Sequence, residues 1–258
     1  MAAWEAWRDK VGGDAVFTKV TIAPENLAQI DKILDFFVEH GCIHISANPI
    51  YEHAWTAEEA SIYYKKLVAI ADKLLTEDYS RIMTSIFRNN NGYPVPSTYT
   101  TNWCGGTSAM LAFDPEGKAY PCLRYMASSL GPDIPPIIIG DVDGIYNTPE
   151  TQAIYEDMKK VTRQSQSTQE CIDCPIASGC AWCSAANYAM LGSYNKRSTN
   201  ICWMHRAESL ANVYYWNQRY RQDNSERRNP LYLPRNIATK LITDEEYDKL
   251  LILSLDGK

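Results

Sequence analysis

The sequence lacks three features, each of which would assign it to a broad class of protein. No apolar run approaches the roughly twenty residues that span a bilayer. The first ten residues mix both charges and do not form a secretory signal. Basic residues are not in surplus, because 31 acidic residues outnumber 25 basic ones and the net charge is −6. Such a chain has little with which to neutralise phosphates. We therefore predict a cytoplasmic protein that binds neither membrane nor nucleic acid.

Cysteine, by contrast, is abundant, with eight in a chain of 258 residues. In a chain without a secretory signal, cysteines this dense predict metal binding more than disulfides or free thiols. Short spacers between thiols allow neighbouring sulfurs to converge through tight turns. Seven cysteines fall in one half of the chain, four of them closely spaced: Cys104, Cys122, Cys171, Cys174, Cys180, Cys183 and Cys202.

Two kinds of metal site suit these thiols. A zinc ribbon would place two close pairs, Cys171/Cys174 and Cys180/Cys183, around one tetrahedral ion. Only five residues separate the pairs, however, and a single zinc leaves the other three thiols unexplained. Two iron–sulfur clusters, each taking up to four thiolates, account for more of them and are the favoured interpretation.

The first ninety residues predict alternating strands and helices. Strands are expected at 16–22 and 42–47, and helices at 27–40 and 56–75, the latter with a capping box of Thr56 and Glu59. Short links between these elements are typical of parallel βα units. Two such units cannot cover both faces of a parallel sheet. Either the units form a small open sheet, or they belong to a larger barrel that has lost its beginning. We expect the chain to begin in the middle of a domain.

A composition change divides the chain. Residues 89–103 are rich in Asn, Pro, Thr and Gly and predict a linker. Beyond it, 109–113 and 118–122 flank a turn at 114–117, and a strand at 137–142, a helix at 149–161 and an aromatic-rich helix at 201–220 follow. The predicted domains are 1–88, the linker 89–103, a cysteine-rich α+β domain at 104–222, and a carboxy-terminal tail at 223–258 with a weak helix from Thr243.

The cysteine pattern resembles the SPASM domain, the carboxy-terminal extension of many radical S-adenosylmethionine enzymes. Cys104, Gly117 and Cys122 match its first part, within a hairpin typical of the family, Phe113-Asp-Pro-Glu-Gly-Lys-Ala-Tyr-Pro-Cys. The quartet from Cys171 to Cys183 follows, and Cys202 closes the pattern. The last gap of the quartet is two residues, where three is commoner. The phrase Asn195-Lys196-Arg197 and residues 204–207 are similar to the peptide-maturing branch.

This resemblance implies a set of ligands. One 4Fe–4S cluster would be held by Cys171, Cys174, Cys180 and Cys202, and a second by Cys104, Cys122 and Cys183. Relatives with a fully ligated second cluster have a further cysteine shortly after the first, and residues 107–112 contain none. One iron of that cluster would then be open to water or a substrate thiolate. Cys42 is a conceivable fourth ligand, but we expect it to pack as a small apolar residue.

The resemblance also implies a fold and its partners. The βα units would be the last units of a partial (β/α)6 barrel, followed by the SPASM domain. The signature CxxxCxxC, which binds the cluster that cleaves S-adenosylmethionine, is absent from the sequence, as is a Gly-Gly-Glu segment. S-adenosylmethionine and a third 4Fe–4S cluster would belong only to a full-length parent. A peptide or protein substrate and an electron donor such as flavodoxin or ferredoxin are the implied partners.

Several other residues were weighed as catalytic candidates. His44 and His53 are interpreted as structural, and His205 as support for a cluster at Cys202. Asn48 ends a strand where barrel active sites collect residues. Asp141 and Asp143 are expected in a turn, and the buried rings of Trp182 and Trp203 are expected to shield a cluster.

The substrate prediction depends on Leu123. Sulfatase-maturing relatives have an Asp at that position, thought to act as a base, so Leu123 favours modification of a ribosomal peptide over formylglycine formation. The predicted function is the auxiliary-cluster portion of such an enzyme, which this chain alone cannot make active. The alternatives are a non-catalytic zinc-binding interaction module, a formylglycine-forming enzyme, and a disulfide-stabilised binding domain.

Overall fold

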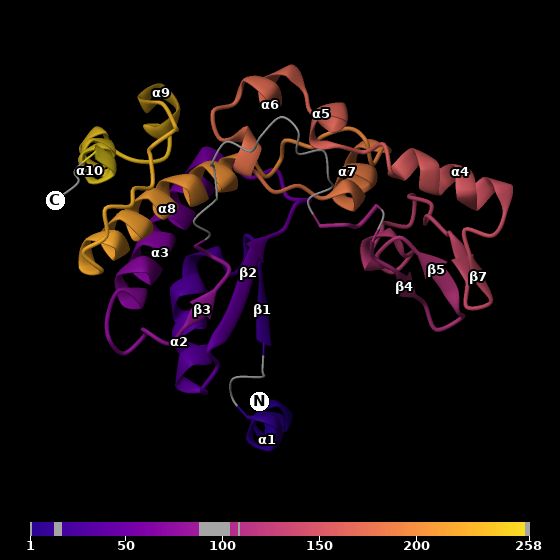
Figure 1. The fold of residues 1–258 in the computed structure, drawn as a ribbon, viewed down its shortest axis with the longest axis horizontal. Helices are drawn as coiled ribbons and strands as arrows, with labels where there is room; N and C mark the ends of the chain where they lie inside the picture. Colours follow the sequence, from indigo (N-terminus) through magenta and orange to yellow (C-terminus); the bar gives the residue numbers. More distant parts are fainter. Residues whose placement is uncertain (1, 13–16, 88–103, 108, 256–258) are drawn as a thin grey trace. The chain divides into compact units, whose positions relative to one another are not determined.

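The chain is mixed α/β and forms two compact units (Figure 1). The structure is a computed structural model that describes residues 2–12, 17–87, 104–107 and 109–255. The first unit comprises Met1–Tyr93 and Asn200–Lys258, and the second comprises Pro94–Thr199. The second unit is therefore inserted in the sequence of the first. The predicted linker at 89–103 lies outside the described residues.

The first unit contains a parallel sheet in the order β1-β2-β3. Its strands are β1 (Phe17–Ile22), β2 (His44–Pro49) and β3 (Met83–Thr84). Helix α1 (Ala2–Val11) precedes them, the 3-10 turn η2 (Leu27–Gln29) and α2 (Ile30–Glu39) connect the first two strands, and α3 (Ala57–Leu74) connects the second and third. The predicted βα alternation is confirmed. The described strands do not close a barrel, so the partial barrel stays a prediction.

Helix α3 begins at the predicted capping box. The Thr56 hydroxyl accepts a hydrogen bond from the Glu59 amide at 3.2 Å, and the Glu59 carboxylate accepts one from the Thr56 amide at 2.8 Å. These bonds satisfy two amides that the first turn of a helix leaves unpaired. Tyr63, Leu67 and Ile70 recur at helical spacing along the buried face of α3.

A long helix, α8 (Cys202–Gln222), packs beside α3 in the first unit (Figure 1). Tyr214 donates a hydrogen bond to Asp72 at 2.5 Å, and Gln222 donates one to the Leu75 carbonyl at 3.2 Å. The sequence predicts this helix within the cysteine-rich domain at 104–222. The structure groups it with the first unit, because these contacts join it to α3.

The carboxy-terminal tail also packs in the first unit, as α9 (Arg235–Ala238) and α10 (Asp244–Leu255). Buried amide side chains fix the turn that follows α8. Asn217 donates to the Asn229 carbonyl at 2.8 Å, and its own side-chain oxygen accepts from the Asn229 amide at 2.9 Å. Paired amides of this kind avoid the cost of burying unsatisfied polar groups. Nowhere in the described part of the chain is a helix both long and apolar enough to cross a membrane.

The second unit opens with a small antiparallel sheet in the order β4-β5-β6-β7. The predicted turn at 114–117 is present, with Gly117 at φ +82° and its amide bonded to the Asp114 carbonyl at 3.0 Å. Asp141 accepts hydrogen bonds from the Asp143 and Gly144 amides, which confirms the predicted turn. The predicted strand at 137–142 is shorter than expected. The strands are β4 (Ala112–Phe113), β5 (Lys118–Tyr120), β6 (Gly140–Asp141) and β7 (Gly144–Ile145).

Short helices complete the second unit around one apolar core. The core includes Cys122, Tyr125, Ile139, Met158 and Ala185, and Cys183 packs against it. The helices are η3 (Leu123–Tyr125), α4 (Pro149–Met158), α5 (Arg163–Gln166), α6 (Gln169–Asp173), η4 (Ala177–Gly179) and α7 (Ser184–Leu191).

Gly140, the first residue of β6, is required where it pairs with Ile145 of β7, and its replacement by alanine should destabilise the second unit. Gly140 has φ +139°, and an added Cβ would lie 2.2 Å from the Gly144 carbonyl oxygen. We expect Gly140→Ala to cost about 2 kcal/mol, as strained backbone conformations do. Hydrogen exchange of the β6 and β7 amides measures this cost. Gly131→Ala is the control, since its nearest atom would be 3.9 Å away. Equal exchange in the two variants would contradict the prediction.

Candidate metal centre

Two cysteines of the second unit, Cys104 and Cys122, converge at Gly106, and a third, Cys183, lies nearby. Cys122 follows β5 and belongs to the apolar core, and Cys183 precedes the first residue of α7 and packs against that core. A Cβ atom added to Gly106 would lie 3.3 Å from the Cys104 sulfur and 3.8 Å from the Cys122 sulfur. Glycine at this position therefore leaves open the space that both sulfurs face.

The pKa values of these thiols show that all three are electrostatic neighbours. Burial, with smaller contributions from the nearby Cys183 and Cys104, raises the pKa of Cys122 to about 11. Burial also raises the pKa of Cys104, where Cys183 adds to the rise and the Gly106 amide opposes it. Bare thiolates are therefore disfavoured at both Cys122 and Cys104. A bound cation would remove that penalty, because metal binding displaces the thiol protons.

Neutral polar groups border the same three thiols. Burial raises the pKa of the Tyr125 phenol far above its usual value; Ser184 opposes the rise, and the three cysteines add to it. Cys183 stands at the amino end of α7, where its sulfur accepts a hydrogen bond from the Ala186 amide at 3.4 Å. A helix amino terminus stabilises a thiolate. The three thiols, which are soft metal donors, thus lie next to buried surroundings of low dielectric constant.

A second group of thiols lies on consecutive turns. The Cys174 amide bonds to the Cys171 carbonyl at 3.4 Å, the Ala177 amide to the Cys174 carbonyl at 3.0 Å, and the Cys180 amide to the Ala177 carbonyl at 3.2 Å. Thr168 caps the first turn by accepting from the Cys171 amide. Each thiol is half-buried. The turns expected from the short spacers are therefore present.

Arg197 contacts this second group. Its Nη2 atom lies 3.0 Å from the Cys180 sulfur and 3.0 Å from the Ala181 carbonyl oxygen. The side chain is only 6% exposed. Cys180 therefore has a cationic hydrogen-bond donor at its sulfur.

Cys202 is the first residue of α8 and belongs to the first unit. It lies at the carboxyl edge of the parallel sheet, because the Trp55 amide, in the loop after β2, bonds to the Asn200 carbonyl at 3.2 Å. In parallel α/β folds, ligands and reacting groups gather at this edge.

A buried polar chain lies one turn from Cys202. His205 Nδ1 is 2.9 Å from Glu208 Oε2, and the Tyr63 hydroxyl donates to Glu208 Oε1 at 3.2 Å. His205 is 4% exposed, and its ring stands edge-on to that of Tyr51, with centroids 6.4 Å apart. The predicted supporting role of His205 thus has a geometric basis in its bond to Glu208.

All eight cysteines lie within the described residues and carry reduced thiols, with no disulfide framework. Among those residues, no three His, Cys, Asp or Glu side chains are arranged to hold a metal ion. A four-iron cluster has a different requirement. Each thiolate binds a separate iron, so the ligand sulfurs stand farther apart than those around one tetrahedral zinc.

The remaining candidates occupy structural positions. His44 is the first residue of β2, with its ring 4.3 Å from that of Phe17, and so lies at the amino end of the strand. His53 bonds Glu59 at 2.9 Å and links the loop to α3. Cys42 is fully buried before β2. Asn48 pairs in register with Thr21 near the end of β2, and Leu123 is 59% exposed.

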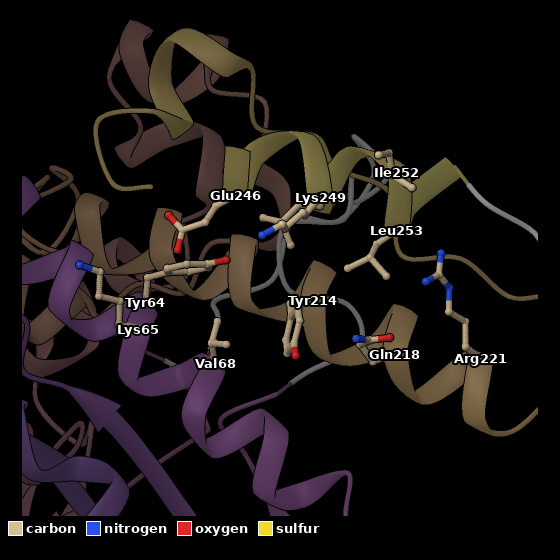
Figure 2. Close-up of a pocket in the computed structure, with 11 residues that line it drawn as sticks. Tyr64, Lys65, Val68, Tyr214, Gln218, Arg221, Glu246, Lys249, Ile252 and Leu253 are labelled. Carbon is tan, nitrogen blue, oxygen red and sulfur yellow. The ribbon is translucent and has the colours of Figure 1, made fainter. Parts of the chain in front are cut away.

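A pocket of about 520 Å³ lies in the first unit among α3, α8 and α10 (Figure 2). The rings of Tyr64 and Tyr214 form one side, and Leu253 of α10 faces them. Burial and the nearby Glu246 raise the pKa of Tyr64 well above its usual value, so the phenol stays protonated. The eleven described lining residues include no cysteine or histidine. This pocket therefore offers no metal ligand of the predicted kind.

Three parts of the site were not predicted from the sequence: Gly106, Arg197 and Glu208. The dipeptide Gly105-Gly106 directly after Cys104 was a visible signal, since paired glycines mark close backbone approach. Arg197 belongs to a phrase that resembles the peptide-maturing branch, but nothing in that phrase indicates its contact with Cys180, and Glu208 gave no signal beyond its charge. No protein-family model matches the sequence, and neither does any curated protein.

Proposed function

We propose that this chain is the auxiliary-cluster portion of a SPASM-type radical S-adenosylmethionine enzyme that modifies a ribosomally made peptide. One observation carries the proposal: the Cys183 thiol, which packs against the core of the second unit, is an electrostatic neighbour of both buried Cys122 and exposed Cys104. A zinc ribbon would need Cys183 beside Cys180, Cys171 and Cys174. The arrangement supports two thiol groups, as the SPASM pattern assigns them, over one four-thiol group.

The residues have distinct roles in this proposal. Cys104, Cys122 and Cys183 hold one 4Fe–4S cluster, and Cys171, Cys174 and Cys180 hold the other together with Cys202. When bound, such clusters accept or pass single electrons or bind a substrate thiolate. Tyr125 and Trp182, both buried, exclude water within the second unit. A dry surrounding shifts cluster potentials, because burial and hydrogen bonds at the sulfurs both contribute.

The position of Cys202 in the first unit also bears on the substrate in this proposal. The carboxyl edge of the sheet, where Cys202 and His205 lie, is where a parallel barrel binds its substrate. A peptide radical formed there, in a complete enzyme, would lose its electron to the auxiliary clusters. Generation of that radical requires the S-adenosylmethionine-cleaving motif, which the sequence does not contain. Exposed Leu123 in place of a basic carboxylate favours a crosslinked peptide product over formylglycine.

Iron and sulfide content, measured anaerobically with an absorption spectrum, tests the proposal. We expect about eight irons and about eight sulfides per chain, in line with two four-iron clusters. The protein should be brown and should bleach on reduction. Stoichiometric zinc in a colourless protein, without iron, would overturn the proposal and leave a zinc-binding interaction module.

A further inference from the structure

The pocket among α3, α8 and α10 has apolar walls and the size of a small-molecule site (Figure 2). Its volume of about 520 Å³ falls within the range of about 300–1,000 Å³ that is typical of ligand sites. Val68, the Tyr214 ring, Leu250 and Leu253 supply the apolar surface. All three helices belong to the first unit, so the pocket is complete within one compact body. A guest that fills it would therefore need a largely apolar body.

One polar group, the Tyr64 hydroxyl, opens into this pocket without a partner. Tyr64 is 4% exposed, and no described residue forms a hydrogen bond with its hydroxyl. Figure 2 shows the hydroxyl directed into the space beneath α10. Because burial and the nearby Glu246 keep the phenol protonated, it is a hydrogen-bond donor. Buried polar groups are normally satisfied, so this hydroxyl indicates an acceptor that the chain itself does not supply.

Two neighbouring tyrosines differ from Tyr64 in this respect. Tyr63 donates its hydrogen bond to Glu208 at 3.2 Å, and Tyr214, in the pocket wall, donates to Asp72 at 2.5 Å. Figure 2 shows the Tyr214 hydroxyl on the side away from α10. Tyr214 therefore contributes its ring to the pocket, whereas Tyr64 contributes a donor.

The charges around the pocket favour an anionic guest. Among the described lining residues, three are cations and one is a carboxylate: Lys65, Arg221, Lys249 and Glu246. In a chain of net charge −6, this is a local excess of positive charge. Figure 2 shows the Lys249 amino group directed toward the Tyr64 hydroxyl. Lys249 also pairs with Glu245 at 2.8 Å, but that pair is exposed and holds the lysine weakly.

The single carboxylate of the lining, Glu246, is already bound at the start of α10. One of its oxygens accepts from the Thr243 amide at 2.8 Å and from the Thr243 hydroxyl at 3.1 Å. These bonds compensate part of its charge, since they come from donors at a helix amino terminus. The cations of the lining therefore determine the sign of the guest.

We propose that this pocket is a binding site for a small carboxylate with an apolar body. The carboxylate accepts the Tyr64 hydrogen bond beside Lys249, and the apolar body covers Val68, Leu250 and Leu253. Hydrogen bonds to an ionised acceptor are the stronger ones, and buried apolar surface adds to the affinity. A cationic guest would meet like charges, and a wholly polar one would leave the apolar walls uncovered. The inference goes beyond the proposed function and does not depend on it, since no described residue of the lining is a cysteine.

Calorimetric titration of the full chain with decanoate tests this site. Tyr64→Phe should weaken decanoate binding about tenfold, which is about 1.4 kcal/mol, because it removes a hydrogen bond to a charged group. Tyr214→Phe is the matched control, since it keeps the ring and removes a hydroxyl that bonds Asp72 instead of facing α10. Free Tyr64→Phe protein should be no less stable than wild type, because the lost hydroxyl has no partner in the described part of the chain.

Guests with the same body and a different head group test the assignment of charge. Decanoate should bind more tightly than 1-decanol, and decylamine should bind least tightly. Lys249→Gln should weaken decanoate binding about threefold, as expected for an exposed cation, and leave 1-decanol binding unchanged. Lys240→Gln is the control, because Lys240 is an exposed lysine outside the pocket lining.

The outcomes are distinct from those of the iron measurement, because iron content does not enter this experiment. Titration with 2-naphthoate separates the two bodies that the walls fit: tighter binding than decanoate supports an aromatic carboxylate, and weaker binding an aliphatic one. Equal losses in Tyr64→Phe and Tyr214→Phe overturn the role of Tyr64. Decylamine that binds as tightly as decanoate overturns the choice of an anion. If neither carboxylate binds at millimolar concentration, the proposed site is wrong.

Discussion

Gly106→Val is expected to remove one of the two proposed clusters, about four irons of about eight per chain, while leaving every cysteine in place. Even a Cβ at this position would lie 3.3 Å from the Cys104 sulfur and 3.8 Å from the Cys122 sulfur. The two further methyl groups of valine would occupy the space that these sulfurs face. The backbone of Gly106 lies outside the left-handed region, so the substitution adds no strain there.

Iron content and the electron paramagnetic resonance signal of each cluster measure this loss. Gly131→Val is the matched control, because the nearest atom to its Cβ would be 3.9 Å away and the residue is exposed. Gly131→Val should keep about eight irons, and Gly106→Val about four, with the cluster at Cys171, Cys174 and Cys180 intact. A Gly106→Val protein with its full iron content would show that these thiols do not share a cluster.

Glu208→Ala is expected to lower the free energy of unfolding of the first unit by about 3 kcal/mol, since it removes one member of a buried polar chain. His205 and the Tyr63 hydroxyl would both lose their bond to the carboxylate. The Tyr63 phenol stays protonated and neutral near neutral pH, because burial and Glu208 raise its pKa far above the usual value. The His205 ring and the Tyr63 hydroxyl would then each be buried without this hydrogen bond, which destabilises the folded state by the cost of desolvating each group.

Hydrogen exchange of the α3 and α8 amides measures the effect of Glu208→Ala. Glu245→Ala provides the comparison, because Glu245 also pairs on a helix, with Lys249 at 2.8 Å, but at an exposed position. Exposed pairs contribute little, so this control should lose less than about 0.5 kcal/mol. Similar losses in the two variants would show that the chain from Tyr63 to His205 does not stabilise the packing of α3 on α8.

Sequence periodicity predicted the local elements of this fold well, because their causes are local. The capping box of Thr56 and Glu59 set the start of α3, and the Pro115 and Gly117 turn set the β4-β5 hairpin. The place of α8 could not be predicted in this way. Its partner α3 is distant in sequence, and the bond from Tyr63 to Glu208 joins residues 145 positions apart. Nothing near either residue in the sequence indicates that contact.

The thiol groups show a similar division. Spacing alone favoured two iron–sulfur clusters over a zinc ribbon in which Cys180 and Cys183 act as a pair, but it did not assign Cys183 to either group of thiols. The grouping of Cys183 with Cys104 and Cys122 came from the family resemblance, and the structure places these three thiols together. Arg197 could not be predicted, because a buried arginine and a solvated one are alike in sequence. Only the surroundings of its guanidinium distinguish them.

The discontinuous first unit has a consequence for the way the protein is made. A ribosome synthesises β1, β2, α3 and β3 first, then the whole second unit, and only afterwards α8. The buried face of α3, with Tyr63 and Leu67, therefore stays uncovered for as long as residues 94–199 take to emerge, on the order of ten seconds. The second unit, being continuous, can fold during that time. A nascent chain stalled before residue 200 would thus present a folded second unit and an uncovered apolar face of α3, the kind of surface that chaperones and proteases select.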